Sequence, residues 1–77
     1  MNSLPKFKTY DVVISERTKQ EMRDCYYRKK SFVMTLFGEE REYNIAMLYG
    51  ELNVMQSIGV YTSEIAEKEK RYLLGLL

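Results

Sequence analysis

Two segments near the start of the chain carry the hydrophobic pattern of β-strands. In residues 7–14 (FKTYDVVI) aromatic and β-branched side chains nearly alternate with polar ones, which predicts a strand. A compact apolar run, SFVMTLF, predicts a second strand at 31–37, which Gly38 ends. We expect residues 1–5, up to the single proline, to fray.

Between these two segments, residues 16–29 (ERTKQEMRDCYYRK) hold good helix formers and neither Gly nor Pro. Ser15 precedes them as a candidate N-cap. Apolar and small side chains recur on one side at helical spacing: Thr18, Met22, Cys25 and Tyr26. This pattern predicts a helix over 16–29, although the tyrosine pair would also suit the start of a strand.

Residues 39–59 fit two patterns. One helical face would carry the apolar residues Ile45, Leu48, Leu52 and Met55, and acidic residues stand at the start of the segment, where they favour a helix. Apolar and polar residues also alternate over 42–49, which suits a third strand. Length and end signals favour the helix. Such a helix would be contacted on two faces, because its other side is also apolar: Tyr43, Met47, Val54 and Ile58.

The last segment, residues 62–77 (TSEIAEKEKRYLLGLL), predicts an amphipathic helix capped by Thr62 or Ser63. The predicted order is therefore β-α-β-α-α, a small single α+β domain over 1–77 with two to three strands and two to three helices. Two strands form a poor sheet alone. We therefore expect either a third strand at 42–49 or completion of the sheet by a second copy or a partner.

Composition agrees with a small folded protein: 45% of the 77 residues are hydrophobic and 30% are charged. The net charge of +1 is unevenly distributed, since residues 1–31 carry +4 and residues 32–77 carry −3. This asymmetry could orient a partner or favour contact between copies, or it could reflect two ordinary solvated surfaces. No segment approaches the ~20 apolar residues that cross a bilayer. With a lone cysteine and no signal-peptide pattern, we expect a cytoplasmic setting and no membrane partner.

Catalytic chemistry finds little support in the sequence. Cys25 has no histidine to act as its base, because the chain contains none, and we interpret it as a small buried side chain. The four glycines are isolated and form no phosphate-binding loop. The acidic run at 39–42 lacks the spacing of an EF-hand. We therefore expect no enzyme, no cofactor and no metal site.

Basic and aromatic residues alternate in one short stretch, which is the mixture that supplies phosphate contacts and stacking surfaces for nucleic acid. Its members are Tyr26, Tyr27, Arg28, Lys29, Lys30 and Phe32. The alternative is a solvated helix end, where basic side chains complement the helix dipole.

Residues 57–70 (SIGVYTSEIAEKEK) resemble the turn and helix entry of helix-turn-helix regulators, which implies DNA binding through a recognition helix. If residues 63–76 were that helix, their outward side would place Glu64 and Glu67 against phosphates, so we do not expect them to read DNA.

The leucine-rich end predicts an interface. LLGLL matches an L-x-x-L-L pattern that docks into apolar grooves, and Leu74 cannot easily join Leu73 and Leu76 on the core side of a helix. We expect a second copy or another protein to cover this end, with a homodimer preferred. The predicted contact residues are Tyr72, Leu73, Leu74, Leu76 and Leu77.

Together these observations indicate a non-enzymatic small regulatory protein of bacterial or phage type that binds and modulates or inhibits another protein. The alternative is a DNA- or RNA-binding transcriptional regulator that uses the patch at 26–32.

Overall fold

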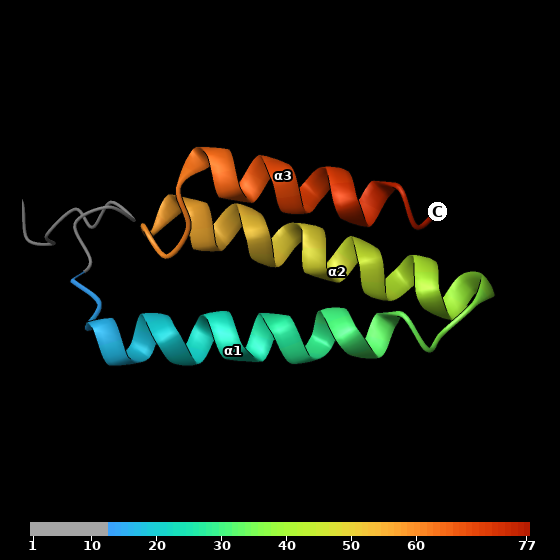
Figure 1. Cartoon of the computed structure of the whole chain (residues 1–77), viewed down its shortest axis with the longest axis horizontal. Helices are drawn as coiled ribbons and strands as arrows, with labels where there is room; N and C mark the ends of the chain where they lie inside the picture. The colour runs from blue at the N-terminus through green and yellow to red at the C-terminus, as the bar shows by residue number, and fades with distance from the viewer. Residues whose placement is uncertain (1–12) are drawn as a thin grey trace, which may run out of the picture.

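Three helices make up the fold in the computed structural model, which describes residues 13–77 (Figure 1). They are α1 (Glu16–Val33), α2 (Gly38–Ser57) and α3 (Ser63–Leu74). Short turns at 34–37 and 58–62 join them, so each helix runs antiparallel to the one before it. α2 packs against both other helices and is the central element of the bundle.

The predicted α+β fold is wrong, because no strand occurs among residues 13–77. The apolar run at 31–37 does not form a strand. Its first three residues complete α1, and in the turn that follows the Leu36 amide donates a hydrogen bond to the Val33 carbonyl (3.1 Å). The physical reason is that Val33 lies two helical turns beyond Tyr26, and both are buried at 1% exposure on the same core-facing side.

The other two strand predictions have different outcomes. Residues 42–49 lie inside α2, so the helical interpretation of 39–59 is confirmed and the strand alternative is wrong. Of the strand predicted at 7–14, residues 7–12 lie outside the described part of the chain. Val13 and Ile14 are described and have no regular structure.

Two of the three helices begin at a side-chain cap. The Ser15 hydroxyl accepts a hydrogen bond from the Thr18 amide (3.1 Å), and Thr62 accepts one from Ile65 (3.2 Å). Phe37 precedes α2 and offers no side-chain cap. Positive φ angles occur at Gly38 (68°) and at Gly59 (80°), where the chain leaves one helix or enters the next.

The core is centred on the inward stripe of α2, as the spacing predicted. Ile45, Leu48, Leu52 and Met55 are all at most 3% exposed. Side chains from the other helices and the second turn complete this cluster: Tyr26, Val33, Val60 and Leu73. The rings of Tyr26 and Tyr61 pack edge to face, with ring centres 6.1 Å apart.

Polar contacts join α1 to α3. One carboxylate oxygen of Glu69 accepts hydrogen bonds from the Tyr26 hydroxyl (2.9 Å) and the Lys30 ammonium (2.7 Å). Burial, followed by this hydrogen bond, raises the pKa of Tyr26 well above its ordinary value. At the other end, Arg41 donates to the carbonyls of Leu36 (2.7 Å) and Leu76 (3.4 Å), which fastens the chain beyond α3 to the first turn.

Neither α1, α2 nor α3, the helices of the described residues, combines the length and apolar character needed to cross a bilayer.

Candidate binding grooves

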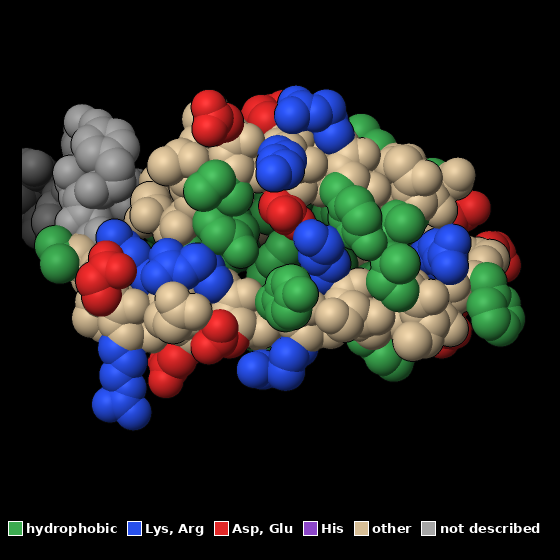
Figure 2. Space-filling model, in the orientation of Figure 1, with side chains coloured by type: hydrophobic (Ala, Val, Ile, Leu, Met, Phe, Trp, Pro, Cys, Tyr) green, Lys and Arg blue, Asp and Glu red, His purple; other side chains and the backbone are tan. Residues whose placement is uncertain are grey.

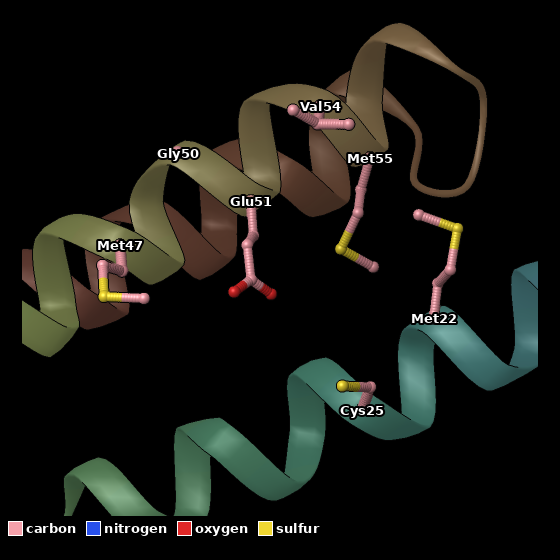
Figure 3. Close-up of a pocket in the computed structure, with 7 residues that line it drawn as sticks. All are labelled: Met22, Cys25, Met47, Gly50, Glu51, Val54 and Met55. Carbon is pink, nitrogen blue, oxygen red and sulfur yellow. The ribbon is translucent and has the colours of Figure 1, made fainter.

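A groove runs between α1 and α2 on the side away from α3 (Figure 3). We call it the methionine groove; it encloses about 480 Å³, and its lining comes from two helices: Met22 and Cys25 of α1, and Met47, Gly50, Glu51, Val54 and Met55 of α2. In Figure 3 the Met22 and Met55 side chains extend toward each other across the gap. No residue of α3 contributes, so this groove is open to solvent along the bundle.

The methionine groove has soft, apolar walls. Met47 is 47% exposed and Val54 is 53% exposed, although neither carries a polar group that would favour water. Thioether side chains are flexible and polarisable, so a surface rich in them adapts to different apolar partners. The arrangement suits the docking of a helix or another apolar element.

An ion pair joins α1 to α2 at the border between the methionine groove and a smaller hollow. The Lys29 ammonium of α1 lies 2.9 Å from the Glu51 carboxylate of α2. This hydrogen bond raises the pKa of Lys29, because it stabilises the charged ammonium. This smaller hollow of about 120 Å³ continues beyond the pair, lined in part by Phe32 and Asn44.

Gly50 leaves bare backbone within the methionine groove. Glycine in the middle of a helix costs about 0.5–1 kcal/mol relative to alanine. A Cβ atom placed there would meet nothing within 4 Å, and the residue has no positive φ angle. Contacts within residues 13–77 therefore do not explain the glycine.

A second groove lies between α2 and the end of the chain. This leucine groove encloses about 500 Å³. Glu42 lines it together with five largely apolar side chains: Ile45, Ala46, Tyr49, Leu74 and Leu77. Leu74 is 52% exposed and Leu77 is 67% exposed. Figure 2, which draws one face of the molecule, shows that hydrophobic side chains reach the surface among basic and acidic ones.

The structure divides the predicted leucine interface between core and surface. Leu73 is fully buried, and Leu76 is half-buried against the core. The Tyr72 hydroxyl lies 3.0 Å from the Met34 sulfur, and the Lys30 ammonium lies 4.4 Å from the centre of the Tyr72 ring. Leu74 and Leu77 are the most exposed members of the predicted interface.

The structure also divides the predicted basic and aromatic patch. Tyr26 belongs to the core, while Lys29 and Lys30 contact the carboxylates of Glu51 and Glu69. Tyr27, Arg28 and Phe32 are exposed on α1, and Lys29 is exposed as well although it is paired with Glu51. The six residues therefore do not form one continuous surface for phosphates and bases.

Sequence reasoning missed the methionine groove as a site. Its signal was present in the second apolar stripe of α2, where helical spacing predicts contacts for Met47 and Val54. The contribution of Met22 and Cys25 from α1 depends on how two helices pack, which the helical spacing of either one does not reveal.

No group of three metal-ligating side chains lies together in residues 13–77. Cys25 is half-buried in the wall of the methionine groove.

Compared with protein-family models, curated proteins and solved structures, the chain matches none of them.

Proposed function

We propose that this chain is a non-enzymatic protein that modulates or inhibits another protein by binding an apolar segment of it in the leucine groove. The observation that carries the proposal is the exposure of Leu74 and Leu77 beside a hollow. Burying one leucine side chain contributes roughly 1.5–3 kcal/mol. Two of them at the rim of a hollow would therefore contribute about 3–6 kcal/mol to the docking of a partner.

The occupant that fits the leucine groove best is one face of an amphipathic helix. The groove lies between the side chains of α2 and the last residues of the chain, so an apolar stripe at helical spacing would fill it. Glu42 is the acidic group in its lining, and basic residues flanking that stripe would complement it.

The test is affinity capture from a host-type lysate at physiological salt, followed by binding of the isolated partner. The double variant Leu74→Asp/Leu77→Asp should lose the partner, because two charges would be buried on docking. Val54→Asp is the matched control, since Val54 is as exposed as Leu74 (53% and 52%) but lies in the methionine groove. Circular dichroism of both variants verifies that the helices persist.

Retention that is unchanged in Leu74→Asp/Leu77→Asp would overturn the proposed site. Treating the lysate with nuclease separates the other class of ligand. If nuclease removes the captured material, nucleic acid is the ligand, and Tyr27, Arg28 and Phe32 become the surface to alter.

A further inference from the structure

We propose that a second copy of this chain covers the methionine groove, with a two-fold axis that runs parallel to the helices. In this dimer α1 of each copy faces α2 of the other, so the two helical pairs form a four-helix contact. The inference does not depend on the proposed function, because it concerns a groove without leucine-end residues.

The first support is that α2 is apolar on two sides. Its inward stripe forms the core of the domain, and its outward stripe holds Tyr43 (68% exposed), Met47 (47%) and Val54 (53%). A helix that is apolar all round is usually buried all round. Within residues 13–77 nothing covers the outward stripe where it lines the methionine groove.

The second support is charge complementarity at the border of the groove. Lys29 of α1 carries a positive charge there and Glu51 of α2 carries a negative one, and their charged groups lie 2.9 Å apart. Opposite charges across an interface favour encounter and set its register.

Two positions of the two-fold axis would stack the α1–α2 faces of two copies, and these charges favour one of them. An axis across the helices at the height of this pair would place α1 against α1 of the second copy, with Lys29 against Lys29 and Glu51 against Glu51. An axis parallel to the helices places α1 against α2 of the second copy, with opposite charges facing each other. The second arrangement is the one that electrostatics favours, and it makes every α1–α2 contact twice.

The Lys29–Glu51 pair lies at the centre of this arrangement. Because the two groups are 2.9 Å apart, they lie at the same height along the bundle. A two-fold axis parallel to the helices preserves that height, so Lys29 of one copy faces Glu51 of the other. The two pairs would then form one alternating cluster of four charges. Gly50 precedes Glu51 and would let α1 of the second copy approach the backbone closely.

The size of the face predicts the strength of the dimer. α1 has 18 residues. It is about 27 Å long at about 1.5 Å per residue, and two adjacent helices are about 20 Å wide. Each copy therefore offers roughly 500 Å², and a pair buries about 1,000 Å², which is near the lower limit for specific interfaces. We expect a dissociation constant in the micromolar range.

The test uses two single variants that are complementary only across the interface. Lys29→Glu and Glu51→Lys each break the pair within their own chain and place four like charges at the centre of a homodimer. Each should weaken self-association by about tenfold or more. When the two variants are mixed, the acidic cluster of one chain faces the basic cluster of the other, so the mixture should associate as tightly as the unaltered chain. Sedimentation velocity from about 1 to 500 μM measures all four samples.

Arg17→Glu is the matched control, because it makes the same charge change on α1 at a side chain that is 89% exposed and does not line the groove. Its association should equal that of the unaltered chain. Circular dichroism verifies folding; loss of a partly exposed ion pair costs about 0–1 kcal/mol, so both variants should keep their helices.

Three results would overturn the proposal: a monomeric unaltered chain throughout this range, single variants that associate normally, or a mixture that associates no better than its components. None of these measurements involves a captured protein, so the dimer and the proposed function fail separately.

Discussion

Lys30 of α1 and Glu69 of α3 form an ion pair of 2.7 Å with only 20% of either side chain exposed. The Glu69 carboxylate also accepts the Tyr26 hydrogen bond, so one acidic side chain joins two groups of the first helix to the last one. An ion pair in this position contributes more to the free energy of unfolding than one on the surface, because water screens it less.

Two replacements of Glu69 should therefore destabilise the domain to different extents. Glu69→Gln keeps an oxygen that can accept the Tyr26 hydrogen bond but removes the charge, and we expect a loss of about 1 kcal/mol in the free energy of unfolding. Glu69→Ala removes both contacts and should cost about 2–3 kcal/mol. Urea unfolding followed by circular dichroism measures the difference. Glu67→Gln is the control, since its side chain is 55% exposed and should cost less than either change. Equal effects at the two positions would contradict the role of Glu69.

Stability should fall in alkaline solution. Burial raises the folded-state pKa of Tyr26 and of Tyr61, whereas tyrosine in an unfolded chain titrates near 10. The folded chain therefore retains protons that the unfolded chain releases. These two tyrosines leave the free energy of unfolding unchanged below about pH 10 and lower it as the pH rises above that value. Lys29, whose pKa is raised by Glu51, acts in the same direction.

Urea midpoints between about pH 8 and 11.5, with phenolate absorbance followed in parallel, would measure this dependence. Tyr26→Phe should be less stable than the unaltered chain at about pH 8, because Glu69 loses a hydrogen bond. Its stability should then decrease less steeply with pH. A slope equal to that of the unaltered chain would contradict the assignment to Tyr26.

Two glycines should respond to alanine in opposite ways. Gly50→Ala adds a side chain that meets nothing within 4 Å and improves helix propensity, so it should stabilise the monomer by about 0.5–1 kcal/mol. Gly59 has a φ angle of 80°, and Gly59→Ala should destabilise the domain by about 1–2 kcal/mol. Thermal unfolding at low protein concentration compares them. A destabilising Gly50→Ala would show that α2 needs this glycine for its own packing.

A side-chain cap at the start of α2 should stabilise the domain. Phe37 occupies the N-cap position, is 80% exposed and makes no side-chain cap. Phe37→Ser should supply the missing acceptor and raise the free energy of unfolding by about 0.5–1 kcal/mol. Thr62→Ala, which removes a cap that is present, should lower it by about 1 kcal/mol. Changes of the same sign in the two variants would refute this account of the caps.

The sequence predicted the helices better than it predicted where the first one ends. Over 39–59 the buried stripe has a clear helical period, and the last helix begins at its own cap residue, Thr62. SFVMTLF was different, because a short apolar run suits a strand and the end of a buried helix equally. What decides between them is the contact of Val33 with a core that other segments build.

The grooves were predictable only in part for a related reason. The second apolar stripe of α2 and the outlying Leu74 can be recognised from helical spacing alone. Their neighbours across each groove come from other helices, and the register between helices places them there. The same register places Lys29 and Lys30 beside carboxylates, which spacing along one segment did not reveal.

The order of the helices has a consequence for how fast the chain folds. α1 and α2, and then α2 and α3, are neighbours both in sequence and in space, so each pair forms a hairpin of adjacent helices. Helical bundles of this kind fold in microseconds to milliseconds. The contact of Glu69 with Lys30 closes a much longer loop and gains its full value only after both hairpins exist. We therefore expect it to form late, to contribute little to the folding rate, and to slow the unfolding of the finished bundle.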